Sequence, residues 1–211
     1  MQDDGGCEGR VQRFREVPEK LRAALAALRE AAPPPALVLH LGDIINGNAS
    51  QAATDADFGL VASIFEAAEA AGGPETLHLL GNHCLDAGRA AVCARLRVPP
   101  PGYYARVLPG GAWELLVLDT TEMSHPGLPA DAPQAAEAAA FLAAHPLGAA
   151  HPQMSPWNGG VASAQLAWLT ERLAAAAAAG RRVVVAGHHQ VGAGAARPTH
   201  MAWNHQVSTP A

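Results

Sequence analysis

The spacing of apolar residues predicts amphipathic helices that alternate with short buried strands. Apolar side chains recur at helical spacing over residues 13–32, 55–71 and 163–179, and Pro or Gly follows each segment. Short apolar runs cover residues 37–41, 76–80 and 183–186, as expected of strands that are buried on both faces. Helices alternating with such strands favour an α/β fold with parallel pairing.

Two further apolar runs, residues 103–108 and 113–118, flank Pro109-Gly110-Gly111 and predict a hairpin that makes the sheet mixed. Residues 122–160 are rich in Pro, Ala and Gly. Apart from a short helix near 134–144, this stretch is predicted to be an irregular insertion or lid, with a disordered loop as the alternative. Ser163 is expected to cap the helix that follows. Residues 1–211 are treated as a single domain.

Composition narrows the class of protein. The 211 residues are 49% hydrophobic and 16% charged, with a net charge of -5. The cationic residues form no stripe, so nucleic acid is not an expected partner. The sequence shows neither a signal peptide nor an apolar run of the ~20 residues that cross a bilayer. Three cysteines without metal or disulfide spacing favour a reducing compartment, so we expect a cytoplasmic protein without membrane contact.

Candidate chemistry lies where three apolar runs end. Each run continues into glycine and then a possible metal ligand: Gly42-Asp43, Gly81-Asn82-His83 and Gly187-His188-His189. A carboxylate can bridge two cations, an amide oxygen is a neutral ligand, and an imidazole can bind metal or serve as an acid. Taken singly, each motif has an ordinary structural interpretation as a turn, a cap or a buried histidine. Together they predict a hard-metal centre for phosphate chemistry at one edge of the sheet.

These motifs resemble those of the calcineurin-like metallophosphoesterases. The segments 42–48 (GDIINGN), 157–160 (WNGG) with 165–169 (QLAWL), and 202–204 (AWN) are similar to the manganese-dependent ADP-ribose/CDP-alcohol diphosphatase branch. The resemblance implies a metallophosphoesterase-type αββα sandwich with mixed sheets. It also implies that Asp43 bridges two metals, that Asn82 and His188 bind one of them, and that His83 stabilises or protonates the departing oxygen.

The motif set is incomplete at both ends, so the resemblance implies a truncated domain. No Gly-His-x-His follows His188, and Gln2 is the candidate metal ligand of the first motif, without the Asp that precedes such a Gln in the family. Cys84 stands where the family has an acidic residue after Gly-Asn-His, and Asp86 is near enough in sequence to replace it. An open sheet edge and a risk of aggregation are also expected.

The sequence therefore predicts a metal-dependent phosphoesterase or pyrophosphatase acting on small nucleotide diphosphate derivatives such as ADP-ribose or CDP-alcohols. Mn²⁺ is the expected cofactor, with Fe, Zn and Mg left open. We expect two ions in a complete domain, but at most one tightly bound ion and very low hydrolysis of ADP-ribose in this chain. The alternatives are an inactive fragment or pseudoenzyme that binds a cation or a partner, and a phosphomonoesterase or phosphodiesterase of the same superfamily.

Overall fold

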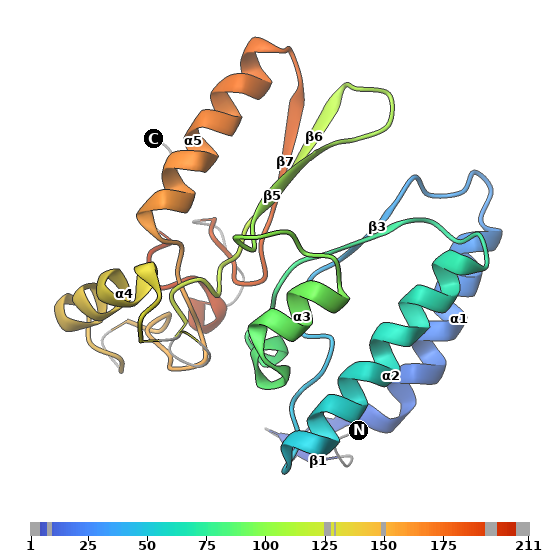
Figure 1. Ribbon diagram of the computed structural model, residues 1–211, viewed down its shortest axis with the longest axis horizontal. Coiled ribbons are helices and arrows are strands. Elements are labelled where there is room, and N and C mark those ends of the chain that lie inside the picture. The colour runs from blue at the N-terminus through green and yellow to red at the C-terminus, as the bar shows by residue number, and fades with distance from the viewer. Residues whose placement is uncertain are drawn as a thin grey trace.

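The protein is described by a computed structural model that covers residues 5–7, 10–124, 128, 130–148, 151–192 and 198–205 (Figure 1). The strands in these ranges are β1 (Gly5–Cys7), β2 (Arg10–Gln12), β3 (Val38–His40), β4 (Thr76–His78), β5 (Tyr104–Val107), β6 (Trp113–Val117) and β7 (Arg182–Ala186). The α-helices are α1 (Val17–Glu30), α2 (Gln51–Ala70), α3 (Arg89–Arg95), α4 (Pro133–Ala144) and α5 (Ser163–Ala178). Three 3₁₀ helices are η1 (Phe14–Glu16), η2 (His83–Ala87) and η3 (Pro198–His200). Within the described ranges, no helix combines the length and the apolar character needed to cross a membrane.

The main elements form four layers, with helices outside and two sheets inside (Figure 1). β3 and β4 pair in parallel, whereas β5, β6 and β7 form a mixed sheet in that order, with β5 antiparallel and β7 parallel to β6. Helices α1 and α2 cover the first sheet, and α5 covers the second from the opposite side. The predicted mixed α/β sandwich is therefore confirmed.

The alternation of side chains along the strands explains these layers. In β6, Leu115 and Val117 are buried between the two sheets, where they meet Leu79. Leu116, between them in sequence, points the other way and packs against Leu169 of α5. A strand that is apolar on both faces is what a central layer requires, because each face removes apolar surface from water.

Two helix starts differ from the sequence-based expectation. Helix α2 begins four residues before the predicted 55, because the Ser50 side chain accepts a hydrogen bond from the Ala53 N–H at 3.3 Å. The prediction that Ser163 caps α5 is wrong, since the N-cap is Ala162 and no side chain caps it from that position. Instead, the Ser163 N–H and hydroxyl donate to the Glu137 carboxylate of α4, at 2.8 and 3.0 Å.

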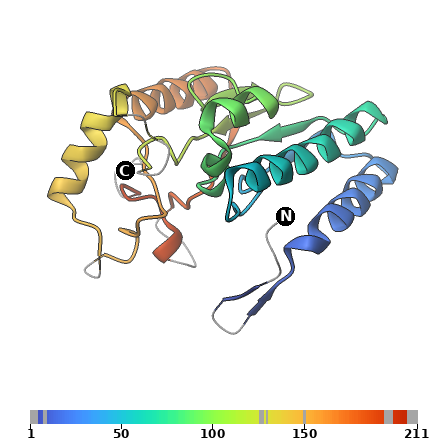
Figure 2. The same ribbon diagram turned by 60° about the horizontal axis from the view of Figure 1, so that its bottom comes forward.

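Residues 122–160 contain more packed structure than an irregular stretch would. The described part includes α4 and a small hydrophobic cluster in which Met123, Ala138 and Met154 pack with Trp203. Figure 2 shows α4 at one side of the molecule, away from α1. The suggestion that this stretch serves as a lid stays a prediction.

A buried pair of histidines should make the fold sensitive to acid. His40 and His78 are partners in the register of β3 and β4, and both rings lie edge-on to Phe65 of α2. Neither Nδ1 atom has a hydrogen-bond partner among the described residues. Burial lowers the pKa of each ring from 6.5 to about 4, so both are neutral in the folded chain at pH 7.

The unfolded chain takes up these protons at a higher pH than the folded chain does. The contribution of the two neutral rings to the free energy of unfolding is therefore fully present above pH 6.5 and is lost as the pH falls towards 4. Each ring should contribute a slope of about 1.4 kcal/mol per pH unit within that window. The slope of unfolding free energy against pH reports how many protons are taken up on unfolding. We expect His78→Gln to reduce this number by roughly one between about pH 6.5 and pH 5. Urea unfolding at several pH values measures this slope. An unchanged slope in the variant would contradict the assignment.

The outer edge of β7 should promote self-association. Among the described strands, β7 lies at one end of its sheet, and Val184 and Val185 are 40% and 42% exposed. An exposed apolar edge strand without a charge in its centre is a template for pairing with another chain. Val185→Lys should therefore slow aggregation in a light-scattering assay. The matched control is Leu60→Lys, which alters a similarly exposed apolar residue on α2 (39% exposed), and equal slowing by both variants would argue against a role for the β7 edge.

Candidate metal centre

Three chain segments converge at the carboxyl ends of β3, β4 and β7. Glycines allow the first two loops to touch, because a Cβ on Gly42 would lie 2.6 Å from the Gly81 nitrogen. A Cβ on Gly81 would in turn lie 2.2 Å from Oδ1 of Asp43. Asp43 itself adopts a positive φ of 52°, a conformation that costs a non-glycine residue energy and often occurs at functional sites. The Asp43 carboxylate therefore lies in close contact with the loop that carries Asn82.

Asp43, Asn82 and His188 form the centre of this cluster. His188 Nε2 lies 3.0 Å from Asn82 Oδ1 and 3.3 Å from Asp43 Oδ2. The other carboxylate oxygen, Asp43 Oδ1, accepts the backbone N–H of His83 at 3.0 Å. Three of the residues expected to ligate metal are thus brought into mutual contact. The fourth, Gln2, lies outside the described residues.

The orientation of the His188 ring suits a metal ligand. Nδ1 lies 2.8 Å from the Leu41 carbonyl oxygen, which can only accept, so Nδ1 carries a proton and the Nε2 edge faces Asp43 and Asn82. Nε2, the amide oxygen and the carboxylate oxygen are all electron-pair donors. A proton or a cation must therefore lie among them.

The electrostatics of the metal-free cluster agree with this geometry. Burial disfavours the charge on both Asp43 and His188, but their hydrogen bond and mutual attraction outweigh it. The pKa of Asp43 is consequently lowered and that of His188 is raised. In the described part of the chain, no three His, Cys, Asp or Glu side chains gather in a way that could hold a metal. The candidate centre consists of one carboxylate, one imidazole and the Asn82 amide.

A cavity of about 570 Å³ opens at the cluster and gives a ligand access to it. Its walls are formed by Asp43, Asn82, His83, Trp157, Asn158, His188, His189, Gln190 and His200. Trp157 is 52% exposed and lines this cavity, so its aromatic ring is accessible to a ligand there. The sequence places Trp157 in the WNGG motif, but its exposure at this cavity depends on the folded structure.

The two histidines after β7 have different surroundings. His189 is only 4% exposed, and its backbone N–H donates to Thr120 Oγ1 at 2.9 Å. Its ring nitrogen Nδ1 lies 3.1 Å from the same hydroxyl oxygen. Burial lowers the pKa of His189 to about 4, so the ring is neutral and helps to hold the loop of Thr120 beside the site.

The remaining motifs that resemble the diphosphatase branch form a scaffold around the cavity wall. The Gln165 amide oxygen accepts the Asp119 N–H at 2.9 Å, and its NH₂ group donates to the Asp119 carbonyl at 3.0 Å and to Glu122 at 2.6 Å. Asn204 makes a similar pair of hydrogen bonds, because its amide oxygen accepts the Val161 N–H and its NH₂ group donates to the Val161 carbonyl. The backbone N–H of Trp203 donates to the Gly159 carbonyl at 2.7 Å. These residues fix the loop that carries Trp157 and Asn158.

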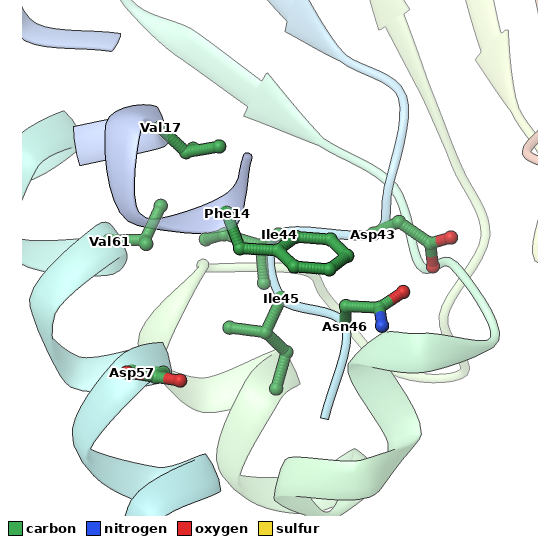
Figure 3. A pocket seen from close by; sticks show the side chains of 8 residues that line it. All are labelled: Phe14, Val17, Asp43, Ile44, Ile45, Asn46, Asp57 and Val61. Carbon is green, nitrogen blue, oxygen red and sulfur yellow. The ribbon is translucent and has the colours of Figure 1, made fainter. Parts of the chain in front are cut away.

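A second cavity, of about 290 Å³, lies on the other side of Asp43 (Figure 3). Phe14, Val17, Ile44, Ile45 and Val61 supply its apolar walls, and Asn46 and Asp57 supply polar atoms. Figure 3 shows Asp43 at the rim, with its carboxylate directed away from Val17 and Val61. The carboxylate oxygens of Asp43, the candidate metal ligands, therefore face away from these apolar walls.

Comparisons with known proteins agree with the motifs. No profile of a known protein family matches the chain. Manganese-dependent ADP-ribose/CDP-alcohol diphosphatases of Oryza sativa subsp. japonica and Arabidopsis thaliana are 29% and 28% identical to it over 180 residues, which is 79% of this chain. The enzyme of that name from Mus musculus is 25% identical over 88% of the chain. The chain spans 55%, 57% and 61% of the lengths of these three relatives.

A solved structure shows the same fold. The crystal structure of a dimetal phosphatase from Danio rerio superposes with a TM-score of 0.82 over 96% of this chain and 70% of that one, at 23% identity. The chain thus resembles manganese-dependent ADP-ribose/CDP-alcohol diphosphatases in sequence and a dimetal phosphatase in fold, which confirms the predicted resemblance to the metallophosphoesterases.

Proposed function

We propose that the protein is a metal-dependent phosphoesterase that cleaves the diphosphate linkage of small nucleotide derivatives such as ADP-ribose or CDP-alcohols. The observation that carries the proposal is the convergence of Asp43, Asn82 and His188 at the floor of an open cavity. The relatives named for these substrates and the dimetal phosphatase fold support it.

The donor set fits a hard or borderline divalent cation. Asp43, Asn82 and His188 would hold it through carboxylate, amide and imidazole atoms, a set that suits Mn²⁺ and leaves Fe, Zn and Mg open. When bound, such a cation supplies Lewis acidity and offsets the negative charge of the phosphate groups. We propose one tightly held ion for this chain, with a second depending on further ligands such as Gln2.

The residues of the chain have separate tasks in the proposed reaction. His83 is held by its backbone to Asp43 and presents its ring to the cavity, where it can give a proton to the departing oxygen. Trp157 offers an exposed aromatic face on which a nucleobase can stack. The buried network of Gln165 and Asn204 keeps that wall in place.

One observation favours a second candidate, a non-catalytic metal-binding relative. Cys84 occupies the position after His83, and it is fully buried in the core, so it cannot orient the His83 ring as a carboxylate would.

The free thiols of Cys84 and Cys93 fit the cytoplasmic location that we propose.

The test is hydrolysis followed by ³¹P NMR. With Mn²⁺ present, ADP-ribose should yield AMP and ribose 5-phosphate, and CDP-choline should yield CMP and phosphocholine, at rates above that for p-nitrophenyl phosphate. EDTA should stop both reactions, and Asp131→Asn, which changes an exposed carboxylate outside the site, should leave them unchanged. Preference for p-nitrophenyl phosphate would favour a phosphomonoesterase, and metal binding without any hydrolysis would favour the non-catalytic candidate.

A further inference from the structure

The carboxylate of Asp86 lies beside the ring of His83. Both residues belong to η2, and their three-residue spacing places them on the same side of this 3₁₀ helix. Asp86 Oδ2 is 3.9 Å from His83 Nδ1. That distance exceeds a hydrogen bond, but hydrogen bonds of catalytic groups are often long before substrate binds. Among the described residues, this is the only ion pair that Asp86 forms.

The neighbouring loop is shaped to admit the Asp86 carboxylate. Gly47 has a φ of +70°, and a Cβ there would lie 2.2 Å from Asp86 Oδ2. Any side chain at this position would displace the carboxylate. The backbone of Asp86 is also held, because the side-chain amide of Gln51 at the start of α2 donates to its carbonyl oxygen at 3.0 Å.

The residue directly after His83 is unable to take this role. Cys84 is 0% exposed and packs in the hydrophobic core, and burial raises the pKa of its thiol. It therefore offers no charge to the His83 ring. Asp86 is the carboxylate that the fold brings to Nδ1 instead.

We propose that Asp86 is a positioning residue that holds the His83 ring with Nδ1 towards itself and Nε2 towards the reacting phosphate. The inference rests on the proposed function for its catalytic part, but the contact between the two side chains can be tested separately. A carboxylate at Nδ1 fixes the tautomer and the ring orientation of an imidazole, and by analogy with the carboxylates that orient metal-bound histidines we expect an effect of about 10- to 100-fold on activity.

The kinetic test compares Asp86→Asn, Asp86→Glu and the control Asp55→Asn. Asp55 is a matched control because it also contacts Gln51, at 2.8 Å, and lies on α2. With Mn²⁺-loaded protein, Asp86→Asn should lower kcat for ADP-ribose about 10- to 100-fold and change KM less than about 2-fold. Asp86→Glu should recover most of the loss, and Asp55→Asn should cause none.

The choice of substrate separates positioning from a general loss of structure. A p-nitrophenyl ester of thymidine 5′-phosphate releases an anion that needs no proton, so Asp86→Asn should slow its hydrolysis much less than that of ADP-ribose. In a His83→Ala background, Asp86→Asn should have no further effect on ADP-ribose. Equal losses for the two substrates, additive losses in the double variant, or a normal rate in Asp86→Asn would overturn the proposal.

The second test needs no activity. ¹⁵N NMR of the imidazole groups in the metal-free chain, at about pH 8, reports which ring nitrogen carries the proton, and His83→Gln identifies the His83 signals. We expect the Nδ1–H tautomer to predominate in the original chain and to lose its predominance in Asp86→Asn but not in Asp55→Asn. If the chain hydrolyses nothing, the proposed function fails while this measurement still decides the contact. An unchanged tautomer in Asp86→Asn would refute the positioning role.

Discussion

Asp43→Asn should abolish tight Mn²⁺ binding and, with it, hydrolysis of ADP-ribose. Asparagine is nearly the same shape and tolerates the left-handed backbone of position 43, so the fold should survive. The change removes the charge that a bridging ligand supplies and weakens the attraction to His188. We expect the dissociation constant for Mn²⁺ to rise by at least about 100-fold, because partners that merely orient a ligand are already worth about 10- to 100-fold.

Isothermal titration with Mn²⁺ measures this change, and urea unfolding checks that the variant is folded. Asp131→Asn is the control for the loss of one negative charge, since that residue is exposed and outside the cavity. Retained micromolar affinity in a folded Asp43→Asn protein would show that the metal site lies elsewhere.

His83→Ala should separate turnover from metal binding. His83 lines the cavity, and the hydrogen bond that it makes to the candidate ligand Asp43 comes from its backbone N–H. Because alanine keeps that backbone group, the metal content of the variant should stay close to that of the original chain. The rate of ADP-ribose cleavage should fall by about 10²- to 10⁴-fold, as expected when a general acid is removed.

Metal analysis and single-turnover kinetics on the same preparation make this comparison. The matched control is His151→Ala, which removes an exposed imidazole from a turn outside the cavity. Equal losses of rate and metal content in His83→Ala would mean that His83 is a ligand, not an acid.

The strands and the strand ends were predictable because their signals are local. Apolar runs such as 76–80 and the glycines that follow them define buried strands and tight loops, whatever the rest of the chain does. Parallel pairing then places Asp43 and Asn82 at one edge. The contact of His188 with both residues crosses between two sheets, because β7 pairs with β6 and not with β3 or β4, so it depends on how the two sheets pack together.

Other features depended on contacts between distant segments. The N-terminus of α5 is satisfied by Glu137 from another helix, which no local cap signal reveals. Among the described residues, the Nδ1 atoms of His40 and His78 have no hydrogen-bond partner, and Trp157 is exposed. Both features depend on which residues pack around these side chains. Sequence proximity suggested Asp86 as a substitute carboxylate, but the space for it is created by Gly47, which lies before α2.

His188 and Asp43 are expected to bind a divalent cation together, and pulsed electron paramagnetic resonance of Mn²⁺-loaded protein detects the His188 part of this site. The modulation of the electron spin echo should show coupling to an imidazole nitrogen, which should vanish in His188→Ala and persist in His189→Ala, because only His188 directs Nε2 at the cluster. Absence of nitrogen coupling in the original chain, or its persistence in His188→Ala, would show that His188 does not bind the cation.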